Sequence, residues 1–219
     1  KNEPEMTEEE IVSIEFGTEG LSPSLIKGKM LEILDYDPWN KTALTKLSEL
    51  EYGDASRLYR LDALRSENSD LQYAADFLVW EANEEVMSSK GNDVGRLCHR
   101  IGEIVGIVVK DRREKLEAFA KIIILANEIL ESQNKIMQMN MLLKSSLILE
   151  KDYPGAMSVL LSKNLPCTKT AIMDLLVKEE NMDNSLQTEL LCAISGNPYL
   201  FTDLQIRQSV CNRIFQMGL

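Results

Sequence analysis

The residues that most often carry out enzyme chemistry are sparse in this chain. It has one histidine, His99, and four cysteines: Cys98, Cys167, Cys192 and Cys211. Nucleophilic catalysis by cysteine or serine needs a base that a third group holds in place. Cys98 and His99 are neighbours in the sequence, so their side chains would point about 100° apart on a helix. The pattern therefore predicts no catalytic role for His99, which we expect on a solvated helix stripe.

Metal and nucleotide sites are not indicated either. The cysteines form no CxxC pair, and a single histidine does not complete a zinc site. The sequence contains no calcium-binding loop and no glycine-rich phosphate loop of the GxxxxGK[ST] or GxGxxG type. We therefore expect no cofactor and no metal.

Acidic residues leave one enzymatic alternative open. Among the 35 acids, only the fold can bring two carboxylates into one concave pocket, because spacing alone does not define such a pair. Adjacent acids such as Glu84 and Glu85 lie near helix ends and are expected to be solvated. Whether the chain is an enzyme stays open at this point, with the balance against it.

Composition and charge narrow the classes of partner. Of the 219 residues, 44% are hydrophobic and 27% charged, the balance of a folded, soluble protein. The net charge of −11 repels phosphate backbones and anionic lipids, so we expect no nucleic-acid partner. The widely spaced cysteines indicate free, buried thiols in a reducing compartment, and hence an intracellular protein, cytoplasmic or nuclear. The first residue is Lys1, so we expect the chain to be part of a longer protein or a complex.

The most basic region of this acidic chain offers a candidate site. Six basic residues gather there: Arg96, Arg100, Lys110, Arg112, Arg113 and Lys115. One interpretation is a docking patch for an acidic partner protein, formed by Arg96, Arg100, Arg112 and Arg113. The other is a solvated helix face at a helix junction. Aromatic residues are not interleaved with these charges, so a base-stacking platform is not supported.

Helical periodicity dominates the elements that must position these residues. Ser22 followed by Pro23 predicts a helix start, and Asp37 followed by Pro38 predicts another. The range 112–132 predicts a long helix that is apolar around much of its circumference, so we expect it to be packed on more than one side. The residues expected to point inward are Leu116, Phe119, Ile123, Ala126 and Leu130, and those that widen the apolar stripe are Ile122, Ile124, Leu125 and Ile129. No stretch shows sustained alternation, so no sheet is required.

These patterns predict an all-α fold of roughly nine to eleven helices. The architecture is either an irregular multi-helix domain or a short α-solenoid-like array of helical repeats. We expect residues 1–6 to be a flexible segment, and a capping-box pattern at Thr7 to open a short helix. Residues 7–219 would form a single all-helical domain, with a break near Gly91 dividing it into lobes 7–90 and 92–219.

The segment 101–110, "IGEIVGIVVK", is ambiguous. Its apolar run is too short to span a bilayer, which takes about twenty residues, and we expect no membrane span. Within it "IVGIVV" is compatible with a strand, but a helix accounts for more of the pattern. On a helix, Gly102 and Gly106 have the spacing of a close helix–helix contact. We therefore predict that a neighbouring helix packs tightly against them, with the helix of 112–132 as one candidate.

A resemblance suggests a second function. The stretch 95–146, with its Arg-containing link before "LEAFAKIIILANEIL" and an asparagine at Asn134, resembles part of the Ras-family guanine-nucleotide-exchange catalytic domain. The resemblance implies an all-helical fold and a small GTPase as partner. The helical hairpin with which that family opens the GTPase site has no counterpart here. We therefore predict a non-catalytic, protein-binding scaffold or regulator, with the exchange factor as the alternative.

Overall fold

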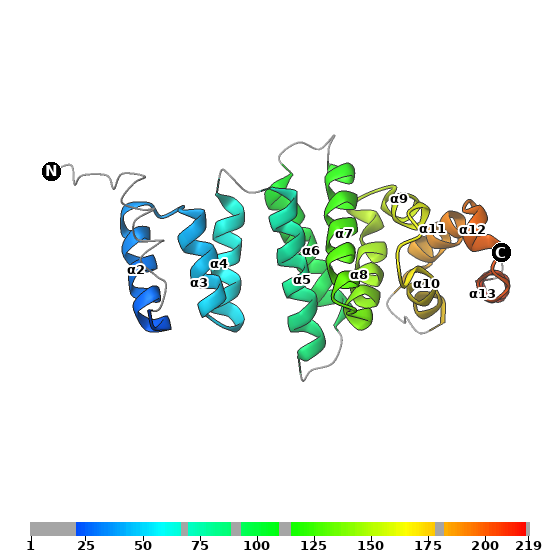
Figure 1. The fold of residues 1–219 in the computed structure, drawn as a ribbon. Coiled ribbons are helices and arrows are strands. Elements are labelled where there is room, and N and C mark those ends of the chain that lie inside the picture. The colour runs from blue at the N-terminus through cyan, green and yellow to red at the C-terminus, as the bar shows by residue number, and fades with distance from the viewer. Residues whose placement is uncertain (1–20, 67–69, 89–92, 110–114, 178–181, 218–219) are drawn as a thin grey trace. The chain divides into compact units, whose positions relative to one another are not determined.

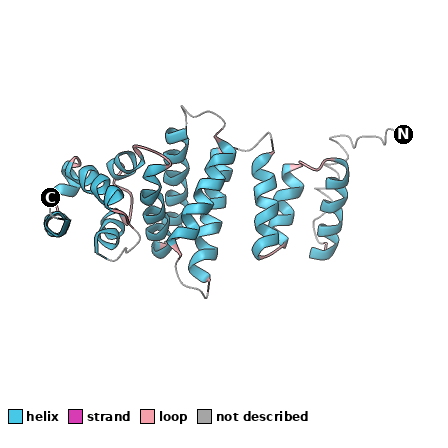
Figure 2. Cartoon of the chain, turned by 180° about the vertical axis from the view of Figure 1, so that it is seen from behind, coloured by secondary structure: helices cyan, strands magenta, loops and turns pink. Residues whose placement is uncertain are grey.

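The computed structural model describes residues 21–66, 70–88, 93–109, 115–177 and 182–217. These residues form twelve α-helices and one 3-10 turn, and they contain no strand (Figures 1 and 2). The predicted all-α fold is confirmed. The described helices slightly outnumber the nine to eleven expected, because one-turn helices such as α12 (Pro198–Phe201) stand as separate elements. The predicted flexible segment 1–6 and the helix predicted from Thr7 lie outside the described residues.

The described residues fall into two compact units, which divide after Asp70. Unit 1 contains α2 (Pro23–Tyr36), α3 (Lys41–Leu50) and α4 (Gly53–Arg65), with α3 packed against the other two. As predicted, α2 begins with Ser22 as its N-cap and a proline in its first turn. The N-cap of α3 is Asn40 and not Asp37, because the Asn40 side chain accepts the backbone N–H of Ala43.

The core of unit 1 lies where α2 faces α3. Its buried side chains are Met30, Ile33, Ala43 and Leu47. The partly buried Ile26, Leu34 and Tyr59 pack against them, so α4 also contributes a side chain to this cluster. A buried hydrogen bond from the Ser56 hydroxyl to the Ser48 carbonyl, 2.5 Å long, joins α4 to α3.

Unit 2 opens with four long helices. They are α5 (Leu71–Met87), α6 (Val94–Val108), α7 (Lys115–Ser132) and α8 (Ile136–Ile148). Helix α5 contacts α6 and α7, and α8 contacts all three, so two helical hairpins stack on each other (Figure 1). Helix α7 supplies Phe119, Ile123, Ala126 and Leu130 to the core, as its periodicity predicts.

Shorter helices complete unit 2. They are α9 (Ala156–Ser162), α10 (Thr168–Val177), α11 (Asn184–Ser195), α12 and α13 (Leu204–Met217), with the 3-10 turn η1 (Leu149–Lys151) leading into α9. Helix α9 packs on α7, α8 and α11, while α10 packs on α8 and α13. Helix α9 is therefore the element that joins the long helices to α11.

The division after Asp70 differs from the lobe boundary that the sequence suggested near Gly91. Helices α5 and α6, which flank that position, contact each other inside unit 2. An ion pair between Glu85 and Arg96 also joins these two helices. The division into lobes 7–90 and 92–219 stays a prediction. A single domain over residues 7–219 stays a prediction.

The segment after Arg100 is helical, but its glycines do not have the predicted role. Residues up to Val108 belong to α6, so the strand interpretation is wrong. A Cβ atom built on Gly102 or on Gly106 would meet nothing within 4 Å. The predicted tight packing of a neighbouring helix against these glycines is therefore also wrong. Buried contacts of α6 are made by Leu97, Ile101, Ile104 and Val105 instead.

Candidate functional site

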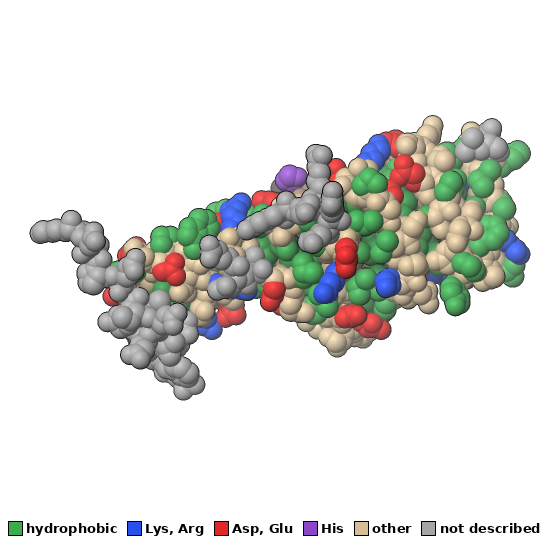
Figure 3. Space-filling model, turned by 90° about the horizontal axis from the view of Figure 1, so that it is seen from above, with side chains coloured by type: hydrophobic (Ala, Val, Ile, Leu, Met, Phe, Trp, Pro, Cys, Tyr) green, Lys and Arg blue, Asp and Glu red, His purple; other side chains and the backbone are tan. Residues whose placement is uncertain are grey.

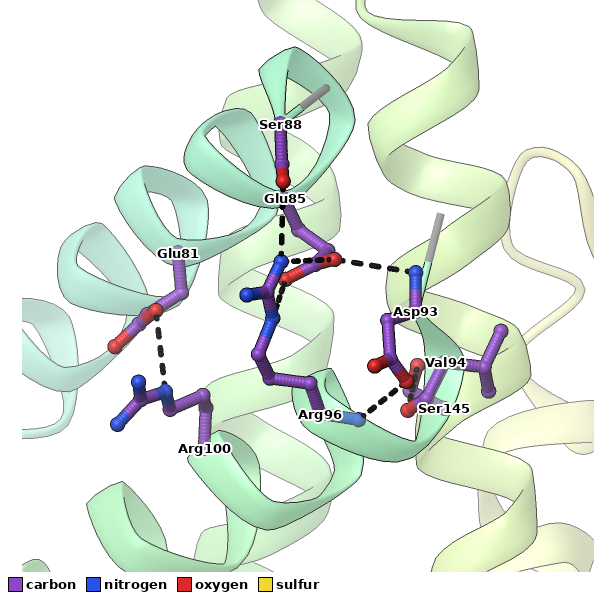
Figure 4. A network of polar contacts seen from close by, with 8 residues as sticks. All are labelled: Glu81, Glu85, Ser88, Asp93, Val94, Arg96, Arg100 and Ser145. Carbon is purple, nitrogen blue, oxygen red and sulfur yellow. Dashed lines mark hydrogen bonds and ion pairs between the residues drawn. The ribbon is translucent and has the colours of Figure 1, made fainter. Parts of the chain in front are cut away.

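Two of the four arginines of the predicted docking patch lie on α6 and turn toward acidic residues of α5 (Figure 4). The Arg96 guanidinium donates from Nε and Nη2 to the two carboxylate oxygens of Glu85, at 2.5 and 2.7 Å. Arg100 Nε lies 3.9 Å from a carboxylate oxygen of Glu81. Arg112 and Arg113 lie outside the described residues.

The carboxylate of Glu85 is buried and accepts several hydrogen bonds, whereas its position in the sequence predicted a solvated charge. Its side chain is 7% exposed, and besides Arg96 it accepts the backbone N–H of Asp93 at 3.1 Å. The hydrogen bond with Glu85 is the main reason that the pKa of Arg96 is raised. The neighbouring Glu84 is exposed, as predicted. We refer to Glu81, Glu85, Arg96 and Arg100 as the α5–α6 ion cluster. In this cluster the Arg96 guanidinium is paired with a carboxylate of the same chain. The docking patch itself stays a prediction.

A groove between α7 and α9 has the character of a binding site. Its volume is about 590 Å³. The apolar residues that line it are Leu116, Ala120, Ile124, Leu125 and Val159, and its charged residues are Glu117, Lys121 and Lys163. Ala120 is buried at 4% exposure, whereas Ile124, Leu125 and Val159 are partly exposed. We refer to these eight residues as the α7–α9 groove.

Aromatic packing holds the two sides of the groove together. The ring of Tyr153, just before α9, stacks on Phe119 of α7 with centroids 4.2 Å apart and planes 15° from parallel. The ammonium of Lys115 lies 4.6 Å from the centre of the Tyr153 ring, within the range of a cation–π interaction. Burial raises the pKa of Tyr153 to about 12, so the phenol stays neutral at physiological pH.

The start of α9 is set by one carboxylate and one glycine. The backbone N–H groups of Gly155 and Met157 donate to the two oxygens of Glu150, at 2.5 and 2.7 Å. Gly155 has φ +93°, a left-handed conformation that glycine adopts without strain. A Cβ on Gly155 would lie 3.3 Å from Cδ2 of Leu116, so α9 begins in close contact with α7. The groove is thus built on a rigidly capped helix.

The charged residues of the groove differ from most other charges of unit 2. Lys144, Lys151 and Lys169 form ion pairs with Asp174, Asp183 and Asp203. The side chains of Lys121, Lys163 and Glu117 make no ion pair or hydrogen bond with any described residue. All three are exposed. Charges of both signs are intermixed with hydrophobic side chains on the face shown in Figure 3. The lining of the groove carries two lysines and one glutamate, an excess of one positive charge, although the chain as a whole is acidic.

A second hollow, of about 480 Å³, bears on the enzymatic alternative. It is lined by residues of α9, α11 and α12 and includes two carboxylates, Glu150 and Glu189. Both oxygens of Glu150 already accept backbone N–H groups at the start of α9. General acid–base catalysis requires a carboxyl that is within reach of substrate and exchanges its proton. The geometry therefore favours a structural role for Glu150 over membership of a catalytic pair.

Of the other residues considered for chemistry, Cys192 lines the second hollow, and the rest line neither hollow. His99 is exposed on α6. The four cysteines are free thiols, but Cys192 and Cys211 are exposed and the other two are partly buried, so the expectation of four buried thiols is wrong. Burial raises the pKa of the Cys167 thiol, which weakens it as a nucleophile. Within the described residues no group of histidine, cysteine or acidic side chains is arranged to hold a metal ion.

The remaining comparisons concern membranes and known proteins. None of the helices in the described ranges has both the length and the apolar character needed to cross a membrane. Comparison of the chain with family models, with curated proteins and with solved structures found no match. The asparagine of the exchange-factor resemblance, Asn134, lies in the turn between α7 and α8 with φ 55°.

The sequence pattern contained one signal for the groove. The apolar stripe of α7 is wider than one packed face, because Ile124 and Leu125 extend it. We interpreted the whole stripe as buried among neighbouring helices. The structure buries Ile122 and Ile123 completely and leaves Ile124 and Leu125 at the groove. No sequence feature indicated that Val159 and Lys163, about forty residues later, would complete the site.

Proposed function

We propose that this chain is a non-catalytic, helical protein-interaction module and that the α7–α9 groove binds a segment of another protein. The observation that carries the proposal is the open apolar lining of the groove. Ile124, Leu125 and Val159 remain partly exposed between two helices, while Phe119, Ile122, Ile123, Ala126 and Leu130 of α7 are buried.

Burial of this lining by a partner would be favourable. Removing apolar surface from water contributes about 25 cal/mol per Å², and grooves between helices are a recurrent way to bind peptide segments. The cap of α9 and the Tyr153–Phe119 stack keep the groove formed before binding, which lowers the ordering cost of association. Scaffold and regulatory roles, an intracellular location and the exchange of nucleotide on a small GTPase stay predictions from the sequence.

A selection experiment tests the proposed function without assuming the partner. A library of random peptides is selected on the chain and then counter-selected on Val159→Glu, which places a charge in the groove. Val177→Glu is the matched control, because Val177 is 68% exposed on α10 and does not line the groove. We expect peptides that bind the wild type and the control but not Val159→Glu.

The folded state of each variant is checked by thermal melting before selection. If Val159→Glu melts early, Ile124→Gln replaces it, since this variant keeps the side chain's length and removes its apolar character. Recovery of no groove-dependent peptide from the library would overturn the proposed function.

A further inference from the structure

We infer that the segment bound in the α7–α9 groove is an amphipathic α-helix with acidic residues beside its apolar face. This inference rests on the proposed function and specifies the partner's chemistry. It is carried by the kind of groups that line the groove and by the charges that stand next to them.

The groove favours a helix over an extended peptide. Its walls are side chains carried by α7 and by α9 with its C-cap Lys163, so the groove offers helical backbone and no extended edge. An extended peptide would bury its backbone N–H and C=O groups without partners, because the described residues contain no strand whose edge could pair with them. A helix satisfies its own backbone hydrogen bonds, so only its side chains need to match the groove.

The length of the groove suits a short helical motif. Its lining on α7 extends from Leu116 to Leu125. At 1.5 Å per residue this span is about 14 Å, or two and a half helical turns. Apolar side chains at positions i, i+3 or i+4, and i+7 of a bound helix span about 10.5 Å, so such a motif fits within this length. Two to three such residues would contact Ile124, Leu125 and Val159.

The charges of the groove favour an acidic partner. Lys121 lies on α7 and Lys163 is the C-cap of α9, and neither ammonium is paired with an acid among the described residues. Glu117 is the single acid in the same lining, one turn from Lys121 on α7. An exposed pair between Glu117 and Lys121 would be weak, so it does not prevent Lys121 from meeting a partner's carboxylate.

Three synthetic peptides of about 18 residues, or five helical turns, test the inference. All share one apolar helical face; the first carries glutamates beside it, the second carries lysines, and the third has the glutamates but a scrambled apolar pattern. Binding is measured by fluorescence anisotropy. We expect the acidic helix to bind about tenfold more tightly than the basic one at low salt, with the difference shrinking as salt screens the charges. The scrambled peptide should not bind.

Charge reversal in the protein supplies the matched test. The double variant Lys121→Glu and Lys163→Glu should reverse the preference, so that the basic peptide binds more tightly than the acidic one. Lys135→Glu is the control, because Lys135 also lacks a side-chain partner among the described residues but does not line the groove. This control should leave the preference unchanged.

The outcomes separate this inference from the proposed function. Equal binding of acidic and basic helices, or acidic binding that survives Val159→Glu, overturns the inference. If the library yields groove-dependent peptides that are extended or basic, the inference fails while the proposed function stands. If self-association of the chain at the groove excludes all three peptides, the occupant is a second copy and the inference is likewise overturned. Failure of the library to yield any groove-dependent peptide removes the proposed function itself.

Discussion

The α5–α6 ion cluster and the α7–α9 groove both place basic side chains on helices of unit 2, but the surroundings of those side chains differ. Arg96 faces a carboxylate that is 7% exposed and donates two hydrogen bonds to it. Lys121 and Lys163 are exposed beside an apolar groove, with no acid paired to them in the described part of the chain. Charge density in the sequence singled out the first region, whereas the geometry favours the second as a binding site.

The difference shows that the role of a basic residue depends on whether it has a buried acidic partner. A buried carboxylate that lost its guanidinium would be left without compensation, which is costly, so an arginine in that position is required by the fold. A lysine on the edge of an apolar groove contributes little to folding stability and remains available to a partner. The following changes test this distinction, in order of decreasing effect.

Glu85→Ala should have the largest effect on stability. It removes the acceptor of two Arg96 donors and of the Asp93 N–H, so we expect the free energy of unfolding to fall by about 2–3 kcal/mol. Glu84→Ala, at the adjacent exposed position, should change it by less than about 0.5 kcal/mol. Urea denaturation measures both free energies of unfolding. Equal effects of the two variants would show that the buried Glu85 contributes no more to stability than the exposed Glu84.

Gly155→Ala should weaken the groove region. The residue would have to hold φ near +93°, and its new Cβ would press on Leu116, so we expect a loss of about 1–2 kcal/mol. Urea denaturation gives the size of the loss, and the acidic helical peptide should also bind less tightly. A variant as stable as the wild type would show that α9 does not depend on this left-handed turn.

Gly102→Ala should act in the opposite direction. Open space surrounds the position, and alanine is favoured over glycine inside a helix, so α6 should gain up to about 1 kcal/mol. A rise in melting temperature would check this. A fall in melting temperature would instead support the close helix–helix contact that the glycine spacing predicted.

The ion pair of Asp183 with Lys151 should have the smallest effect, and one that depends on pH. Its hydrogen bond from Lys151 is the main reason that the pKa of Asp183 is lowered in the folded protein. A lowered folded-state pKa gives stability that is present above the unfolded pKa and is lost as the pH falls through the folded value. Asp183→Asn keeps the N-cap of α11 but should remove the part of the decline in melting temperature that begins below about pH 5 and continues through the lowered folded-state pKa. An unchanged acid profile would show that the exposed pair contributes nothing.

Much of the fold could be predicted because helical signals are local. The Ser22–Pro23 start of α2 and the inward residues of α7 follow from caps and periodicity, which depend on neighbours within a few positions. The all-α class needed no more than this. The role of the glycines in α6 could not be obtained in this way, because spacing identifies a possible contact face without showing which helix meets it.

The sequence by itself determined which segments are helical, which face of each is apolar, and that the usual metal, phosphate and nucleophile motifs are missing from it. Tertiary structure alone decided that Glu85 is buried against Arg96, that Ile124 and Leu125 stay partly exposed, and that Val159 and Lys163 lie beside them. The physical reason is that periodicity reports the direction of a side chain around its own helix axis. Whether that side chain meets a carboxylate, a neighbouring helix or a groove depends on packing between segments far apart in the chain.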